Sequence, residues 1–168
     1  MKKVALVIAE REFRDEEYQV PHRILKEAGF SVLTASTSTS TAVGKLGLKV
    51  RPDTLISDLK PDELDALVFI GGGGSEQYFD DPLAHRLASA MVELDRVLGA
   101  ICIAPVILAK AKVLEGKKAT VFPDGASILK QYGADYTESD VEIDGKIITG
   151  NGPDAADAFG RSLIRLLS

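Results

Sequence analysis

The chain has 168 residues, 45% of them hydrophobic, and its 20 basic and 25 acidic side chains leave a formal charge of −5. This length suits one good core, so we expect residues 1–168 to form a single domain. The charges are interspersed and no apolar run approaches the ~20 residues of a membrane span, which argues against nucleic acid and membranes as partners.

The first half of the chain alternates strand-like and helix-like patterns. Continuous apolar runs are typical of strands covered on both faces, and small and apolar residues at steps of three and four indicate helices. In chain order we expect a strand over 4–8, a helix over 15–28 that stops at Gly29, a strand over 30–35, a loop over 36–41, an edge hairpin over 46–50 and a strand over 66–70.

The second half continues the alternation. We expect a helix that starts at Pro82 after the N-cap Asp81 and runs through Leu98, a strand over 99–101, a helix over 104–112, a strand over 118–122, a helix over 126–132, a hairpin over 141–149 and a last helix from Pro153. This order predicts an α/β fold, with helices on both faces of a mostly parallel sheet.

Two segments fall at the carboxyl ends of predicted strands, where such folds place their sites. The first is the glycine run Gly71 to Gly74. It lacks the residues of a phosphate-binding or dinucleotide motif, but glycines allow close backbone approach, so exposed amides there could stabilise an oxyanion. A tight surface loop is the alternative.

The second segment holds Cys102, the single cysteine. One cysteine cannot form an internal disulfide, and the start of the chain lacks a signal-peptide pattern, so we expect a cytoplasmic location. A buried, inert thiol is common. Cys102, however, stands between a predicted strand and a predicted helix, an elbow at which the helix N-terminus favours an ionised, reactive thiol.

Glu17 is a candidate partner for that thiol. Steps of four, seven and eleven residues lead from Glu17 to Pro21, Ile24 and Ala28, which places its carboxyl group on the inward helix face. An inward carboxyl group without a cation should have a raised pKa and could share a proton with a nearby thiolate. The alternative is a carboxylate at a frayed helix start.

A histidine base for Cys102 is not evident in the sequence. Ile103 follows the cysteine, and the two histidines, His22 and His85, are expected on helix surfaces. No metal-ligand spacing is present, so we expect neither a metal nor a cofactor. Arg14, Asn151 and Pro153 are weaker candidates for a pocket, since each also fits a surface loop.

Three features together resemble the ThiJ/PfpI superfamily. They are Glu17 four residues before Pro21, the strand end Ile70-Gly71-Gly72-Gly73, and the elbow from Ala100 to Pro105. The resemblance covers nearly the whole chain and implies a flavodoxin-like three-layer sandwich, a nucleophile elbow and a homodimer. It also implies roles for four residues: nucleophile for Cys102, protonated hydrogen-bond partner for Glu17, and backbone oxyanion donors for Gly73 and Ile103.

The sequence departs from two branches of this superfamily. PfpI-like peptidases have a histidine where Ile103 stands, and the deglycase branch often has one where Phe122 precedes Pro123. We therefore expect a cofactor-free enzyme for small reactive carbonyls such as methylglyoxal, or for their adducts with amines and thiols, linked to stress protection. The alternatives are a redox-sensing protein with an oxidisable cysteine and, more weakly, an intracellular cysteine peptidase.

Overall fold

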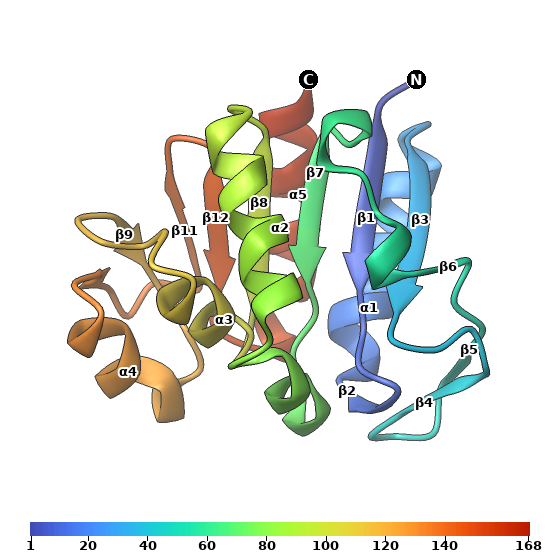
Figure 1. The fold of residues 1–168 in the computed structure, drawn as a ribbon, viewed down its shortest axis with the longest axis horizontal. Coiled ribbons are helices and arrows are strands. Elements are labelled where there is room, and N and C mark those ends of the chain that lie inside the picture. The colour runs from blue at the N-terminus through green and yellow to red at the C-terminus, as the bar shows by residue number, and fades with distance from the viewer.

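A computed structural model describes residues 1–168 and has a seven-stranded sheet at its centre (Figure 1). The strand order is β11-β12-β8-β7-β1-β3-β6, and every neighbouring pair is parallel except β11 with β12. The strands are β1 (Lys3–Val7), β3 (Ser31–Ser36), β6 (Thr54–Leu55), β7 (Ala66–Phe69), β8 (Val97–Ile101), β11 (Val141–Asp144) and β12 (Ile147–Gly150).

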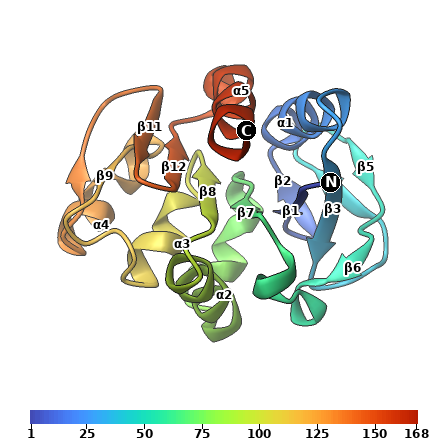
Figure 2. The ribbon, with the colours of Figure 1, turned by 90° about the horizontal axis from the view of Figure 1, so that it is seen from above.

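Helices cover both faces of this sheet, which gives three layers (Figure 2). The helices are α1 (Asp15–Glu27), α2 (Pro82–Glu93), α3 (Pro105–Lys110), α4 (Ala126–Gln131) and α5 (Ala156–Leu167). Helices α1 and α5 pack on one face, and α2 and α3 on the other. The predicted flavodoxin-like three-layer sandwich with a mostly parallel sheet is therefore confirmed.

Strand β1 shows why the sheet needs cover on both sides. Val4 and Leu6 belong to the cluster of 18 buried residues under α1 and α5, whereas Ala5 and Val7 belong to the cluster of 26 under α2 and α3. Successive side chains of a strand point to opposite faces, so a continuous apolar run has two apolar faces to bury.

Two small sheets lie beside the main one. Strands β2 (Arg11–Phe13), β4 (Ala42–Gly44) and β5 (Lys49–Val50) form the first, and β9 (Lys118–Ala119) and β10 (Asp135–Tyr136) form the second. The sequence predicts a hairpin over 46–50, but the observed one starts earlier, because β4 precedes that range and only its turn and β5 fall within it. It pairs with β2 and not with the edge of the main sheet. The strand predicted over 118–122 is also shorter, because pairing with β10 covers two of its residues.

The helix predicted through Leu98 ends earlier, at Glu93. Asp95 has a φ of +55°, which a helix cannot continue, and Leu98 lies fully buried in β8. The four-residue step from Leu94 to Leu98 imitates helical spacing, but Leu94 is 43% exposed, so that step does not follow a buried helix face.

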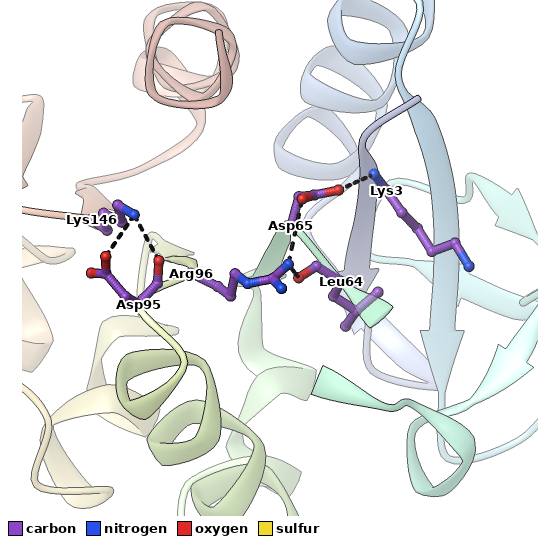
Figure 3. A network of polar contacts seen from close by, with 6 residues as sticks. All are labelled: Lys3, Leu64, Asp65, Asp95, Arg96 and Lys146. Carbon is purple, nitrogen blue, oxygen red and sulfur yellow. Dashed lines mark hydrogen bonds and ion pairs between the residues drawn. The ribbon is translucent and has the colours of Figure 1, made fainter. Parts of the chain in front are cut away.

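The amino-terminal ends of four neighbouring strands are tied together by polar contacts (Figure 3). The Asp65 carboxylate accepts from the Lys3 backbone N–H at 2.8 Å, and the Arg96 guanidinium donates to the Leu64 carbonyl at 2.8 Å. The Lys146 ammonium likewise donates to the carbonyl and carboxylate of Asp95. These contacts fix the amino-terminal ends of the strands, and a site can form at the opposite edge of the sheet, where the strands have their carboxyl ends.

No helix is both long and apolar enough to cross a bilayer.

Candidate active site

Cys102 sits on a sharp turn between β8 and α3. Its φ of +65° is unusual for a residue with a side chain, and a backbone held this way costs about 1–3 kcal/mol. Two hydrogen bonds hold it there: the Cys102 N–H donates to the Gly150 carbonyl at 2.8 Å, and the Phe122 N–H donates to the Cys102 carbonyl at 2.7 Å. The predicted elbow is present, and it is anchored from two distant segments.

Glu17 lies on the inward face of α1, as its helical spacing predicts, and its side chain is fully buried. Neither carboxyl oxygen has a hydrogen bond of good geometry to another group. The polar group with the largest effect on its pKa is the Cys102 thiol, followed by the Arg14 guanidinium and the Gly71 N–H. A buried carboxyl group left in this condition is costly, which marks it as a functional candidate.

Gly71 explains how the acid and the thiol can meet. A Cβ on Gly71 would lie 2.6 Å from Glu17 Oε1, 2.6 Å from Cys102 Cβ and 2.6 Å from the Ile101 carbonyl oxygen. Side chains do not tolerate contacts this short, so only glycine leaves the space. The glycine run thus serves close approach, and it is buried at Gly71 and Gly72, so the alternative of a tight surface loop is wrong at these two positions.

Burial raises the pKa of Glu17 from 4.5 to about 7. The Cys102 thiol, the Arg14 charge and the Gly71 N–H all oppose this shift, but desolvation outweighs them. The raised pKa predicted for an inward carboxyl group is therefore confirmed, and Glu17 is poised to change its protonation state near neutral pH.

The expectation of an easily ionised, partly exposed thiol is wrong. Cys102 is only 9% exposed, and burial, followed by the charge of Glu17, raises its pKa to about 12. The backbone N–H groups of Gly72 and Ile103 favour the thiolate but have less effect than burial and Glu17. Helix α3, with six residues, does not compensate for desolvation.

The two raised values together describe one acid pair. Below about pH 7 Cys102 and Glu17 hold two protons, and between about pH 7 and 12 they hold one. In that range the pair carries a single negative charge, and the thiol stands next to a carboxylate that can accept its proton. Glu17 can then act as a general base that takes the thiol proton as the sulfur attacks, which does not require prior ionisation of the thiol.

Two backbone N–H groups are directed at the sulfur. One belongs to Ile103, and the other to Gly72, to which the sequence gave no role. Gly73, predicted with Ile103 as an oxyanion donor, lines the neighbouring cavity, and that role stays a prediction. Gly72 has a φ of +98°, so the turn of its peptide toward the sulfur requires glycine.

A cavity of about 270 Å³ opens beside Cys102. It has room for a small molecule, and its lining mixes cations, an acid, bare glycine backbone and an apolar side. The lining residues are Arg14, Lys45, Gly72, Gly73, Cys102, Ile103, Phe122, Asp124 and Pro153. The sequence indicated Arg14 and Pro153 weakly, but gave no signal for Lys45 or Asp124.

The other candidates lie elsewhere. His22 packs its ring against Tyr18, and His85 makes a 2.7 Å contact through Nε2 with the Phe79 carbonyl. Asn151 donates to Asp140. None of the three lines the cavity, so this chain places no histidine beside its cysteine.

The buried charge of Glu17 makes a prediction about stability. The folded state binds the Glu17 proton more tightly than the unfolded chain does. The contribution of Glu17 to the free energy of unfolding is therefore greatest below about pH 4.5 and is lost as the pH rises toward 7. That difference in pKa corresponds to about 3 kcal/mol. Glu17→Gln should therefore be more stable than the parent by about 3 kcal/mol at pH 8, with a much smaller gain at pH 5.

Urea unfolding of both proteins at the two pH values measures this effect. Groups that do not contact Glu17 titrate equally in the parent and the variant, so the change in the stability difference between pH 5 and pH 8 reports on Glu17 and its partner Cys102. A loss of stability in the variant at pH 8 would contradict an unpartnered buried carboxylate. Glu27→Gln, on the exposed end of the same helix, is the control and should change stability little at either pH.

The fold and the site define a class of protein, an α/β sandwich with a cysteine on a strand-to-helix elbow facing a buried carboxyl group. Residues 2–166 match the model of the DJ-1/PfpI family. The chain belongs to this family.

Relatives and solved structures agree with that assignment. The chain is 39% identical to an uncharacterised protein of Methanocaldococcus jannaschii over 98% of this chain and 82% of that one, and 32% identical to a deglycase of Pyrococcus abyssi over 96% and 98%. It superimposes on a ThiJ/PfpI domain protein from Brachyspira murdochii with a TM-score of 0.96, at 32% identity over 98% and 95% of the chains. YraA of Bacillus subtilis, 34% identical over 99% and 98%, carries a provisional cysteine-protease name. The names of relatives thus place enzymes within the family.

Proposed function

We propose that this chain is a cofactor-free enzyme that converts small reactive carbonyls such as methylglyoxal to hydroxy acids, with Cys102 as nucleophile and Glu17 as proton acceptor and donor. The observation that carries the proposal is the fully buried Glu17 carboxyl group, whose strongest polar neighbour is the thiol. A structural carboxylate would be paired, whereas a proton carrier needs a free oxygen.

The first step forms a bond between Cys102 Sγ and the aldehyde carbon. The thiol proton passes to the Glu17 carboxylate and from there to the carbonyl oxygen, which gives a hemithioacetal and leaves Glu17 ionised. The N–H groups of Gly72 and Ile103 already face the sulfur and Gly73 lines the cavity, so developing negative charge on oxygen has backbone donors near it.

The second step moves a proton between adjacent carbons. Glu17, ionised again, removes the proton from the carbon bonded to sulfur and returns it to the neighbouring carbon. The hydroxyl proton moves at the same time to the former ketone oxygen, which leaves a thioester of lactate. Water then hydrolyses the thioester and regenerates the thiol, so that methylglyoxal and one water give lactate. A carboxyl group with a pKa of about 7 suits both removal and return of a proton at neutral pH.

The direct test incubates the purified chain with methylglyoxal, without added cofactor, and measures lactate as methylglyoxal disappears. We expect one lactate for each methylglyoxal consumed. Loss of methylglyoxal without lactate, as adducts on lysine and arginine would give, would contradict the proposal. The same chain inactivated with iodoacetamide is the control, because alkylation removes the nucleophile and leaves other side chains available for adducts.

Redox sensing is the second candidate. The N–H groups directed at Cys102 Sγ are the donors that a sulfinate would need, and the protonated Glu17 could add one more. Against it, a buried thiol with a raised pKa reacts slowly with peroxide unless Glu17 takes its proton. Mass spectrometry after mild peroxide would show two added oxygens on Cys102, and methylglyoxal turnover would be absent if sensing were the function.

The pH dependence of alkylation tests the proton pair itself. The rate of reaction of Cys102 with iodoacetamide should rise tenfold per pH unit below about 7 and level off above it, because the ionisation of Glu17 supplies the proton acceptor. Glu17→Gln should lose the plateau and rise only at alkaline pH. A parent profile that rises through pH 9, like that of an isolated thiol, would contradict the pairing.

Peptidase activity is the weakest of the three. Ile103 follows the nucleophile and neither histidine lines the cavity, so a histidine base would have to come from a second subunit. A homodimer and a cytoplasmic location, which the sequence led us to expect, are consistent with each of the three functions and stay predictions.

A further inference from the structure

Lys45 places an unpaired positive charge at the cavity beside Cys102. Lys45 is exposed and lines both this cavity and a neighbouring one formed with Arg11 and Glu12, and none of the seven ion pairs in the structure includes it. Lys45 is also absent from the groups that act on Cys102 and Glu17 most strongly. Its charge is therefore available to whatever occupies the cavity.

The turn that carries Lys45 is rigidly built. Asp15, at the start of α1 and only 7% exposed, accepts the backbone N–H groups of Leu46 at 3.0 Å and Leu48 at 2.9 Å. The Lys45 N–H itself donates to the Phe13 carbonyl at 2.9 Å. At Gly44 a Cβ would overlap the Asp15 carboxylate, so this glycine lets the turn close on the acid. A buried acid thus fixes the backbone of the turn that carries Lys45 relative to α1, the helix that carries Glu17.

The remaining charges of the cavity wall define which ligand fits. The Arg14 guanidinium donates to the Glu16 carboxylate from two nitrogens at 3.0 Å each, so Arg14 is already ion-paired, although its charge still acts on Glu17. Asp124 is exposed and lies on another part of the wall. One free cation with an acid elsewhere in the wall suits a ligand with a single negative charge, and disfavours a dianion.

We propose that Lys45 determines specificity by binding a carboxylate on the substrate, so that the preferred substrates are small carbonyl compounds that carry a carboxylate. Only the carbonyl group of the substrate rests on the proposed function. The carboxylate site does not, because Lys45 and the cavity are present whatever reaction Cys102 carries out. Asp15 acts as a positioning residue, which holds the turn and does not touch the ligand.

Alkylation by a matched pair of reagents tests the proposal without any enzyme assay. Iodoacetate and iodoacetamide have nearly the same shape, both lose iodide to Cys102 Sγ, and only iodoacetate carries a carboxylate. The ratio of the iodoacetate rate to the iodoacetamide rate, at pH 8 and low salt, should exceed the ratio for glutathione. Lys45→Gln should lower that ratio about three- to tenfold, roughly the effect of one charge about 4 Å away in a water-like dielectric, which suits an exposed lysine.

Lys49→Gln is the matched control, because Lys49 is an exposed cation on the same hairpin that does not line the cavity. The control should keep the parent ratio, and salt should lower the ratio of the parent more than that of Lys45→Gln. Equal ratios in all three proteins, or equal losses in both variants, would overturn the proposal. If the ratio shifts as expected while methylglyoxal is not consumed, the carboxylate site stands and the proposed reaction fails.

Discussion

Glu17→Gln is expected to lower kcat/KM for methylglyoxal by about 10²- to 10⁴-fold, the usual contribution of a positioned acid or base. Glutamine matches the size of glutamate but cannot accept the thiol proton or move a proton between carbons. Cys102→Ala should abolish turnover, because the covalent intermediate cannot form. Lactate formation over a range of methylglyoxal concentrations measures both variants.

The controls separate chemistry from folding. Glu17→Gln is expected to gain stability at pH 8, so a loss of activity there cannot be attributed to unfolding. Glu27→Gln, exposed on the same helix, should keep full activity. Turnover in Glu17→Gln within tenfold of the parent would mean that another group moves the proton, and Cys102→Ala with parental turnover would remove the mechanism altogether.

Glu17 and Cys102 could be predicted from the sequence because the position of each follows from local spacing. Glu17 shares a helix face with Pro21 and Ile24, and an apolar strand followed by a helix fixes the elbow at Cys102. A helical period and a strand end are properties of ten or so neighbouring residues, so they survive without tertiary information.

Properties of the site that depend on segments distant in the sequence could not be predicted in this way. The thiol pKa is set by burial and by a carboxyl group 85 positions away, and the elbow is anchored from Gly150 and Phe122. Lys45 reaches the cavity only because the buried Asp15 holds its turn. Three-residue strands such as β2, with two of its residues exposed, carry no hydrophobic period to find.

Gly71→Ala is expected to cost about 3 kcal/mol or more in the free energy of unfolding. A methyl group there would meet three atoms at 2.6 Å, among them the Ile101 carbonyl oxygen, which belongs to the central strand β8 and cannot move aside. Forced overpacking of this kind costs about 1–3 kcal/mol where neighbours can give way, and more where they cannot. In a domain of this size the melting temperature should fall by roughly 6–12 °C.

Gly73→Ala is the matched control, because a Cβ at Gly73 meets nothing within 4 Å. We expect its stability to stay within about 0.5 kcal/mol of the parent, as at other open surface positions. The double variant Gly71→Ala with Glu17→Ala should recover part of the loss, since it removes one of the three clashes, and the recovery measures the contact between positions 17 and 71. A Gly71→Ala protein as stable as Gly73→Ala would mean that the acid and the thiol have more space than the structure gives them, and a direct proton transfer between them would lose its geometric basis.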